Sequence, residues 1–145
     1  MDYNNNIPVL YYHSIANHRE KSDWSFLSTQ IDTFKKQINF LHKNGYNTCT
    51  WDELYDHVNG IKILPKKTIK LHFDDGFLDN WSVIFPFMKE KNFKYSILLT
   101  PDFIGKEKGI RDFVDETTDD NALDWWGYLN LGEIKKMHQS GIVDF

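Results

Sequence analysis

The sequence predicts an α/β fold in which helices cover a mostly parallel sheet. Along the 145 residues, apolar runs rich in strand-forming residues alternate with segments whose apolar residues recur at helical spacing. The predicted order begins and ends with a strand and contains five strands separated by four helices. Such alternation is typical of parallel sheets. The chain shows neither an internal repeat nor a linker, so we expect residues 1–145 to form a single domain.

The first part of the chain predicts two strands and two helices. Residues 7–12, IPVLYY, are apolar throughout and predict a fully buried strand. Residues 28–45 predict a helix that ends at a glycine and buries one apolar face. That face consists of Ile31, Phe34, Ile38 and Leu41. Residues 46–51 predict a second strand, and residues 51–58 predict a short helix capped by Asp52.

The third predicted strand, residues 62–75, has two faces of different chemistry. Because side chains alternate along a strand, one face carries apolar residues and the other carries polar ones. The apolar face consists of Ile69, Leu71 and Phe73, and the polar face of Lys70, His72 and Asp74. Residues 79–93 then predict a helix with a break at Pro86, drawn as one turn followed by a helix that begins with the proline.

The remaining elements complete the alternation. Residues 94–101 predict a fourth strand, residues 130–141 a helix, and residues 142–145 a fifth strand. The inward residues of that helix are predicted to be Leu131, Ile134 and Met137. The five strand and helix steps are fewer than the eight of a closed (β/α)8 barrel of about 250 residues, which leaves either an open sheet or an incomplete barrel.

Composition excludes several classes of function. The 21 acidic and 17 basic residues are well mixed and give a net charge of −4, so no basic surface for nucleic acid or anionic lipid is expected. No segment approaches the roughly 20 apolar residues of a membrane span, and no signal peptide precedes the first strand, so a cytoplasmic location is expected. Cys49 is the only cysteine and is expected to be a buried thiol.

The third strand ends in two adjacent carboxylates, Asp74 and Asp75, followed by Gly76. In parallel α/β folds, the loops after the carboxyl ends of strands carry the chemistry. A turn at the glycine can rotate the second carboxylate toward the first, and two neighbouring carboxylates raise each other's pKa unless a cation relieves them. A divalent metal is the simplest such cation, with one aspartate as its ligand and the other as the base that takes a proton from water.

Other interpretations of the Asp-Asp-Gly sequence are also possible. These three residues commonly form only a turn, and in an unrelated α/β protein they would have no other role. A calcium-binding EF-hand loop is excluded because the segment lacks oxygen ligands at alternating positions and the late glutamate. An aspartyl-phosphate site would need a glycine-rich or basic phosphate cradle, which the sequence does not contain.

Three segments resemble the polysaccharide deacetylase family, also called the NodB-homology domain. Residues 68–105, TIKLHFDDGFLDNWSVIFPFMKEKNFKYSILLTPDFIG, resemble the first motif of that family: a strand, T-F-D-D-G, a helix and another strand. Residues 130–145 are similar to the helix and strand that lead to its second motif. Residues 7–15, IPVLYYHSI, resemble the N-terminal strand of its poly-N-acetylglucosamine-type deacetylases. The resemblance implies a distorted (β/α) barrel, incomplete here with about five strands, and residues 1–145 as its N-terminal part.

The resemblance also implies an activity and roles for particular residues. The family removes N- or O-acetyl groups from sugars with a divalent metal, often zinc. By position, Asp74 matches the catalytic base, Asp75 matches a metal ligand, and His13 matches a histidine that serves as general acid. An imidazole is suited to give a proton to the departing amine near neutral pH. His72 stands beside Asp74 where the family often has threonine, so it either lines the site or supports it by packing.

One part of the family pattern is missing from this sequence. The second motif, H-[S/T]-x-x-H, supplies two metal-binding histidines, and no pair among the six histidines has a matching position. One carboxylate alone would hold zinc weakly, since catalytic zinc normally has three protein ligands. The sequence therefore predicts either a fragment of a longer deacetylase or the product of an interrupted gene, not expected to be a competent enzyme alone. Its last strand leaves an open sheet edge that favours self-association.

An aromatic cluster supplies the last candidate contacts. Trp125, Trp126 and Tyr128 lie in an irregular stretch before the last helix, where they either stack on a sugar or fill the core of a long loop. The leading hypothesis is a metal-dependent carbohydrate deacetylase, with an acetylated glycan or amino sugar as substrate. The alternative is a non-catalytic glycan-binding protein of the same fold that lacks the metal-binding histidines.

Overall fold

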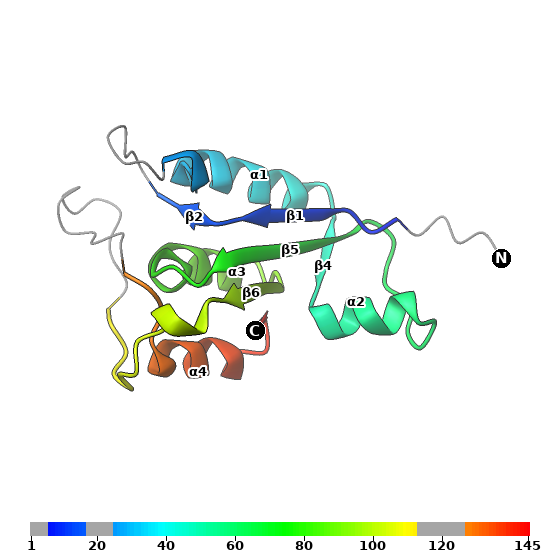
Figure 1. Ribbon diagram of the computed structural model, residues 1–145. Helices are drawn as coiled ribbons and strands as arrows, with labels where there is room; N and C mark the ends of the chain where they lie inside the picture. The colour runs from blue at the N-terminus through cyan, green and yellow to red at the C-terminus, as the bar shows by residue number, and fades with distance from the viewer. Residues whose placement is uncertain (1–5, 17–24, 113–126) are drawn as a thin grey trace.

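The computed structural model describes residues 6–16, 25–112 and 127–145, and these form a parallel sheet flanked by helices (Figure 1). The main sheet consists of β1 (Val9–Tyr12), β4 (Asn47–Cys49), β5 (Thr68–Asp75), β6 (Tyr95–Leu99) and β7 (Val143–Asp144). The α-helices are α1 (Ile31–Lys43), α2 (Trp51–Val58), α3 (Phe85–Glu90) and α4 (Leu131–Gln139). The predicted alternation of strands and helices is confirmed.

Short elements lie between these. Strands β2 (Ser14–Ile15) and β3 (Ser28–Thr29) form a separate parallel ladder that the sequence did not predict. Single turns of 3-10 helix are η1 (Ser25–Leu27) and η3 (Pro101–Phe103), and η2 (Asn80–Ile84) is a π-helical turn. The η2 turn runs directly into α3, which has Pro86 in its first turn as predicted, but Ile84 and Phe85 both have helical backbone angles, so the predicted break at this proline is absent. None of the helices in the described ranges is long and apolar enough to cross a bilayer.

Strand β5 is the centre of the sheet. β1 pairs with it from Val9 opposite Lys70 to Tyr12 opposite Phe73. β6 pairs with its second half, and β4 pairs with its first half. All of these pairings are parallel, so the carboxyl ends of β1, β5 and β6 lie at the same edge of the sheet.

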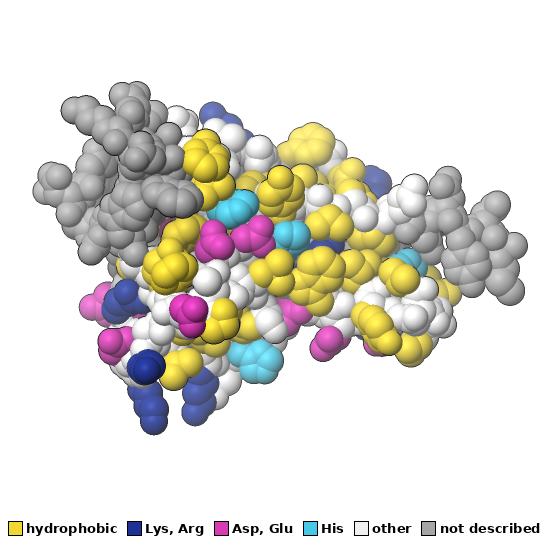
Figure 2. All heavy atoms as spheres, viewed as in Figure 1, with side chains coloured by type: hydrophobic (Ala, Val, Ile, Leu, Met, Phe, Trp, Pro, Cys, Tyr) yellow, Lys and Arg dark blue, Asp and Glu magenta, His cyan; other side chains and the backbone are white. Residues whose placement is uncertain are grey.

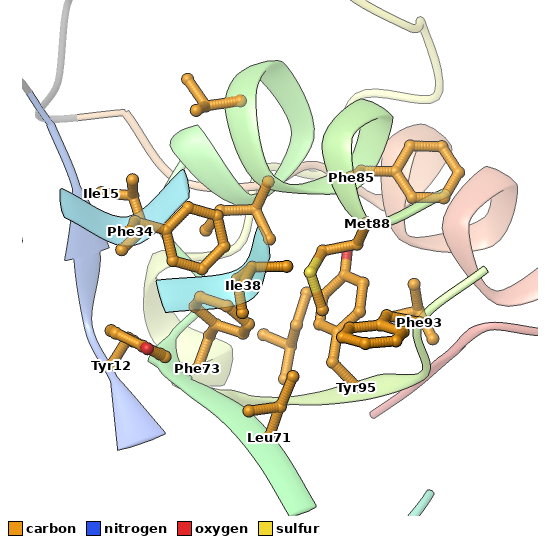
Figure 3. Close-up of a cluster of buried hydrophobic side chains, with 14 of the residues drawn as sticks. Tyr12, Ile15, Phe34, Ile38, Leu71, Phe73, Phe85, Met88, Phe93 and Tyr95 are labelled. Carbon is orange, nitrogen blue, oxygen red and sulfur yellow. The ribbon is translucent and has the colours of Figure 1, made fainter. Parts of the chain in front are cut away.

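The apolar face of β5 packs against the helices to form the core (Figure 3). Ile69, Leu71 and Phe73 are buried on this face, as the alternation predicts. Side chains of α1 and α3 cover them, and β6 contributes neighbouring rings and aliphatic groups. The predicted inward residues of α1, namely Ile31, Phe34, Ile38 and Leu41, are all buried.

The prediction that residues 7–12 form a fully buried strand is wrong. In β1 only Tyr12 is buried, whereas Val9, Leu10 and Tyr11 are 45%, 38% and 65% exposed. Tyr12 packs against Phe34 and Phe73 on the helix-covered face. An apolar run is compatible with a strand buried on both faces. It does not show that other elements of the fold cover both faces.

Two smaller predictions about the helices also need correction. The N-cap of α2 is Thr50 rather than Asp52: its hydroxyl accepts a hydrogen bond from the Glu53 N–H (3.2 Å), and the Glu53 carboxylate accepts one from the Thr50 N–H (3.1 Å). In α4, Met137 is buried and Ile134 packs against the core, but Leu131 is 48% exposed because it occupies the first helical position beside the cap.

The end of β5 is a tight turn with an unusual backbone. Asp75 and Gly76 both have positive φ angles, +70° and +73°, so two consecutive residues are left-handed. The Gly76 N–H donates to the Asp74 carbonyl (2.9 Å), and the Gly76 carbonyl accepts from the Leu129 N–H (2.9 Å). The backbone favours glycine here, and a Cβ atom at Gly76 would lie 2.8 Å from Leu99 Cδ2, so the Leu99 side chain would have to move.

We expect Phe34→Ala to lower the free energy of unfolding by about 3–5 kcal/mol, because Phe34 is fully buried among Tyr12 and Phe73. Phe40→Ala on the same helix is the matched control, since Phe40 is 61% exposed, and it should change the stability by less than about 0.5 kcal/mol. Urea unfolding followed by circular dichroism measures both values. Equal losses in the two variants would contradict the assignment of the core face of α1.

Substitution of Gly76 by alanine should cost more stability than the same substitution at Gly45. Both glycines have φ near +70°, but a Cβ at Gly45 meets no atom within 4 Å. Gly45→Ala should therefore cost about 1–2 kcal/mol from the backbone alone, and Gly76→Ala at least about 1 kcal/mol more because of the contact with Leu99. Urea unfolding of both variants gives the difference, and a Gly76 variant no less stable than the Gly45 variant would show that the turn is not tightly packed.

Candidate active site

The carboxylate of Asp74 lies between two imidazole rings at the carboxyl edge of the sheet. His13 Nε2 is 3.7 Å from Asp74 Oδ2, and His72 Nε2 is 3.5 Å from Asp74 Oδ1. The side chains of His13 and Asp74 are each 25% exposed, so solvent and small molecules can reach them. Figure 2 shows acidic side chains and histidine rings side by side on this face. The structure thus brings together three residues that the sequence singled out.

The sheet explains this meeting of residues distant in sequence. The β1–β5 ladder ends with Tyr12 opposite Phe73. The next residue of each strand, His13 and Asp74, therefore lies at the same level of the sheet edge. His72 precedes Asp74 by two residues and therefore points to the same face of the strand. The positive φ angle of Asp75 turns it out of the strand, and Thr100, just after β6, donates a long hydrogen bond from its hydroxyl to Asp75 Oδ1 (3.4 Å).

The ring of His72 is held by aromatic neighbours from two adjoining segments. Tyr11 on β1 stacks on it with centroids 5.9 Å apart, and Trp51 at the start of α2 lies 5.6 Å away at a tilted angle. Burial lowers the pKa of His72, and the charge of Lys70 lowers it further, whereas Asp74 acts in the opposite direction. A neutral imidazole beside Asp74 is therefore favoured near neutral pH. The His72 ring packs against Tyr11 and Trp51 and also lies beside Asp74, so it has both of the roles that the sequence left open.

Two buried polar atoms at this site have no hydrogen-bond partner among the described residues. They are Asp74 Oδ1 and His72 Nδ1. Buried polar atoms are normally satisfied, and those that are not often mark a functional site. Asp74 Oδ1 is shielded from solvent and lies beside His72 Nε2, so Oδ2, which faces His13, is the oxygen left to take a proton from water. The arrangement suits a general base next to a second titratable group.

The donor set of the described ranges does not complete a metal site. No group of three or more His, Cys, Asp or Glu side chains within them is arranged to hold a metal ion. Asp75 contributes one carboxylate, whereas catalytic zinc takes three protein ligands. Its hydrogen bond from Thr100 would orient that carboxylate, as is common for ligating carboxylates. The prediction of zinc therefore stays a prediction.

A buried lysine lies beneath the site, and the sequence analysis did not assign it a role. The Lys70 side chain is fully buried, and its ammonium donates to the Cys49 carbonyl (3.2 Å) and to the Ser96 hydroxyl. It also lies 4.8 Å from the centre of the Trp51 ring and 3.9 Å from Asp144 Oδ1. Burial lowers the pKa of Lys70 to about 8. The signal was present in the sequence, since Lys70 shares its strand face with His72 and Asp74.

An aromatic stack adjoins the acidic pair. Phe77 follows the Gly76 turn and forms an isolated antiparallel bridge with Tyr128, and their rings stack with centroids 5.1 Å apart. Phe103 stacks on the Tyr128 ring at 4.8 Å and is 55% exposed. Burial raises the pKa of Tyr128, and the charge of Asp75 raises it further, so the phenol lies within electrostatic reach of the site. Phe77 and Phe103 were not predicted as site residues.

The tryptophans predicted to bind substrate, Trp125 and Trp126, lie outside the described residues. Of the predicted aromatic cluster, only Tyr128 is described, and it belongs to the stack with Phe77 and Phe103.

Comparisons with known proteins agree with the fold and with the family resemblance. A protein of Bacillus subtilis (strain 168) named as a polysaccharide deacetylase, YxkH, is 31% identical over 110 residues, which cover 76% of this chain and 36% of that protein. The poly-beta-1,6-N-acetyl-D-glucosamine N-deacetylase of Escherichia coli (strain K12) is 27% identical over 85 residues, covering 59% of this chain and 12% of that enzyme. No family model matches the sequence.

A solved structure shows the same fold. The de-N-acetylase from Aggregatibacter actinomycetemcomitans superposes with a TM-score of 0.72 and 25% sequence identity, covering 95% of this chain and 52% of that one. The chain thus spans about a third of YxkH and about half of this solved structure. The parallel α/β architecture, the Asp-Asp-Gly turn after the central strand and these relatives together show that the chain is similar to polysaccharide deacetylases and shares their NodB-homology fold.

Proposed function

We propose that this chain carries the acid–base residues of a metal-dependent carbohydrate deacetylase that hydrolyses acetamido groups on a glycan. The observation that supports this most strongly is the position of Asp74, whose carboxylate lies between His13 and His72 at a solvent-accessible edge of the sheet. A base and an acid within one site are the minimum that amide hydrolysis requires. The relatives that match this chain are named for deacetylation of polysaccharides.

In the proposed reaction, Asp74 and His13 act on opposite steps. Asp74 takes a proton from the water molecule that attacks the acetamide carbonyl carbon, and a tetrahedral intermediate forms. His13 then donates a proton to the nitrogen as the carbon–nitrogen bond breaks, which releases acetate and leaves a free amine on the sugar. His72, held by its aromatic neighbours, lies 3.5 Å from Asp74 Oδ1 and limits the movement of this carboxylate on that side.

We assign Asp75 as the ligand that this chain offers to a divalent metal, zinc by resemblance. When bound, such an ion supplies a Lewis acid that polarises the carbonyl and lowers the pKa of water. Asp75 is turned away from the strand by its left-handed backbone, and the hydroxyl of Thr100 orients its carboxylate. The proposed base, Asp74, and the proposed metal ligand, Asp75, are thus adjacent residues with different backbone conformations.

The aromatic stack of Phe77, Tyr128 and Phe103 offers a flat surface for a sugar ring beside the acidic pair. Phe77 is tied to the Asp-Asp-Gly turn by sequence, and backbone hydrogen bonds from Leu78 N–H to the Gly127 carbonyl and from Leu129 N–H to the Gly76 carbonyl fix the two segments together (2.9 Å each). The exposed ring of Phe103 is the most accessible member. A pyranose that packs its apolar face on this ring would be held at a fixed distance from Asp75.

Acetate release from an acetylated amino-sugar oligomer, measured on a longer protein that contains this chain together with the two histidines of the second motif, tests the roles of the two aspartates. Asp74→Asn should lower kcat by at least about 100-fold, because the amide cannot accept the proton, while zinc content is unchanged. Asp75→Asn should lower the zinc content of the purified protein, measured by plasma mass spectrometry. Asp32→Asn, an exposed site on α1, is the control and should leave both quantities unchanged. Acetate release that survives Asp74→Asn would overturn the role given to this residue.

Replacement of Phe103 by alanine should raise KM about 3–10-fold and leave kcat within about 2-fold, because one aromatic contact of about 1 kcal/mol is lost from substrate binding. The exposed Phe40 on α1 provides the matched control, and Phe40→Ala should change neither constant. Steady-state kinetics on oligomers of two lengths would measure both. An unchanged KM in the Phe103 variant would exclude the stack as a binding surface.

A non-catalytic glycan-binding protein is the second candidate, and it is favoured by the lack of a three-ligand metal group among the residues that the structure describes. Calorimetry with the same oligomers separates the two functions. Sugar binding without acetate release in the presence of zinc would support the second candidate, and zinc-dependent acetate release would support the first.

A further inference from the structure

A buried carboxylate, Asp79, connects the segment that follows the proposed acid, His13, with the segment that follows the proposed base, Asp74. Asp79 is only 2% exposed, and its Oδ2 atom accepts hydrogen bonds from the Ser14 hydroxyl (2.7 Å) and from the Ile15 N–H (2.5 Å). Its Oδ1 atom receives a long contact from the Asn80 side-chain amide (3.4 Å). Although Asp79 stands at the N-cap position of η2, its side chain makes no capping hydrogen bond there. The carboxylate is therefore directed at the first loop and not at its own helical turn.

The connection lies where the sheet no longer fixes the position of His13. The β1–β5 ladder ends at Tyr12 opposite Phe73, one residue before His13. The chain then leaves β5 and forms the short ladder between β2 and β3, with the Ala16 N–H donating to the Thr29 carbonyl (2.9 Å). The two residues bound by Asp79 are those that directly follow His13.

On the other side, Asp79 lies shortly after the end of β5, the strand that carries Asp74. Four residues separate the two, and they include the left-handed turn that packs against Leu99. A contact between Asp79 and the Ser14–Ile15 segment therefore sets the distance between the proposed acid and base. That distance is now 3.7 Å from His13 Nε2 to Asp74 Oδ2.

We propose that Asp79 is a positioning residue that holds the loop after β1 so that His13 faces the Asp74 carboxylate. The inference rests on the proposed function of His13 and Asp74. A misplacement of about 1 Å between reacting groups can lower a rate by about 100-fold, so a contact that fixes this distance affects catalysis without touching the substrate.

A purely structural role is the competing explanation, since buried polar groups that bind backbone are common in cores. A carboxyl group is a costly choice for that purpose alone. Burial raises the pKa of Asp79 to about 7 although hydrogen bonds from the Ser14 side chain and from the backbone of Ile15 and Asn80 act in the opposite direction, so its charged form is poorly compensated. A neutral acceptor would satisfy the same backbone N–H at a lower cost.

A double-mutant cycle with His13 separates the two explanations. At pH 8, where the Asp79 carboxyl group is charged, Asp79→Asn should lower kcat about 10–100-fold with KM within about 2-fold. The amide oxygen accepts more weakly than a carboxylate from the Ser14 hydroxyl and the Ile15 N–H, and the amide NH2 group would face the Asn80 side-chain amide. In a His13→Ala background, the same substitution should change kcat by less than about 2-fold, because there is no imidazole left to position. Losses that multiply in the double variant would overturn the proposal.

Two further variants keep the test decisive. Ser14→Ala removes one donor and keeps the Ile15 N–H contact, so it should give a smaller loss of kcat of the same kind even if the Asp79 variant fails to fold. Glu133→Gln changes another buried carboxylate, paired with Arg111, and its effect on kcat should multiply with that of His13→Ala. A Ser14 variant whose loss also multiplies with that of His13→Ala would contradict the proposal.

A readout independent of activity distinguishes failure of this inference from failure of the proposed function. Carbon-13 NMR of labelled histidine should show the His13 ring signal shifted in Asp79→Asn and in Ser14→Ala, with the signals of His42 and His138 unchanged. A wild-type protein that releases no acetate but shows this shift would refute the proposed function and keep the positioning contact. An unshifted His13 signal in both variants would overturn the positioning role whatever the activity.

Discussion

Strand β5 determines the arrangement of the described part of the chain, because both of its edges are paired and its two faces meet different surroundings. Its apolar side chains are buried under α1 and α3, and this burial fixes the register of the strand. A shift of one residue would turn Leu71 and Phe73 away from the core and bring Asp74 into it. The hydrophobic core thus sets the orientation of the acidic group at the strand end.

The candidate site is assembled from loops that the parallel sheet brings to one edge. His13 comes from the end of β1, Asp74 and Asp75 from the end of β5, and Thr100 from the end of β6. Each loop is attached to its neighbour by a specific contact: the carboxylate of Asp79 joins the first two, and backbone hydrogen bonds around Gly76 attach the aromatic stack. Such attachments give a site on loops the rigidity that acid–base chemistry requires.

Residue periodicity was sufficient to predict the α/β class, the helices and the alternation along β5, because these features depend on local patterns. It failed for β1, where an apolar run could not reveal that Tyr11 is 65% exposed. The position of Asp74 at a strand end was predictable, and the roles of His13 and Asp75 came from family resemblance. The environment of His72 was not predictable, because its stacking partner Tyr11 and its neighbour Trp51 are far away in sequence.

The long-range contacts of Asp79 and Lys70 belong to the same class. Each is a charged residue in an element that the apolar pattern predicts without reference to it. Its hydrogen-bond partners are distant in sequence and come close only in the folded protein. A charged residue on the predicted buried side of an element could have indicated a buried hydrogen-bonded site, since such groups are rarely buried without partners.

The pH dependence of kcat/KM for acetate release tests the central claim most directly, namely that Asp74 and His13 act as a base and an acid within one site. The account predicts a bell-shaped profile for the wild-type protein, with a rising limb as the base loses its proton and a falling limb as the acid does. In His13→Ala the falling limb should disappear, while the rising limb is retained at a lower rate. A falling limb that persists unchanged in His13→Ala would contradict the account.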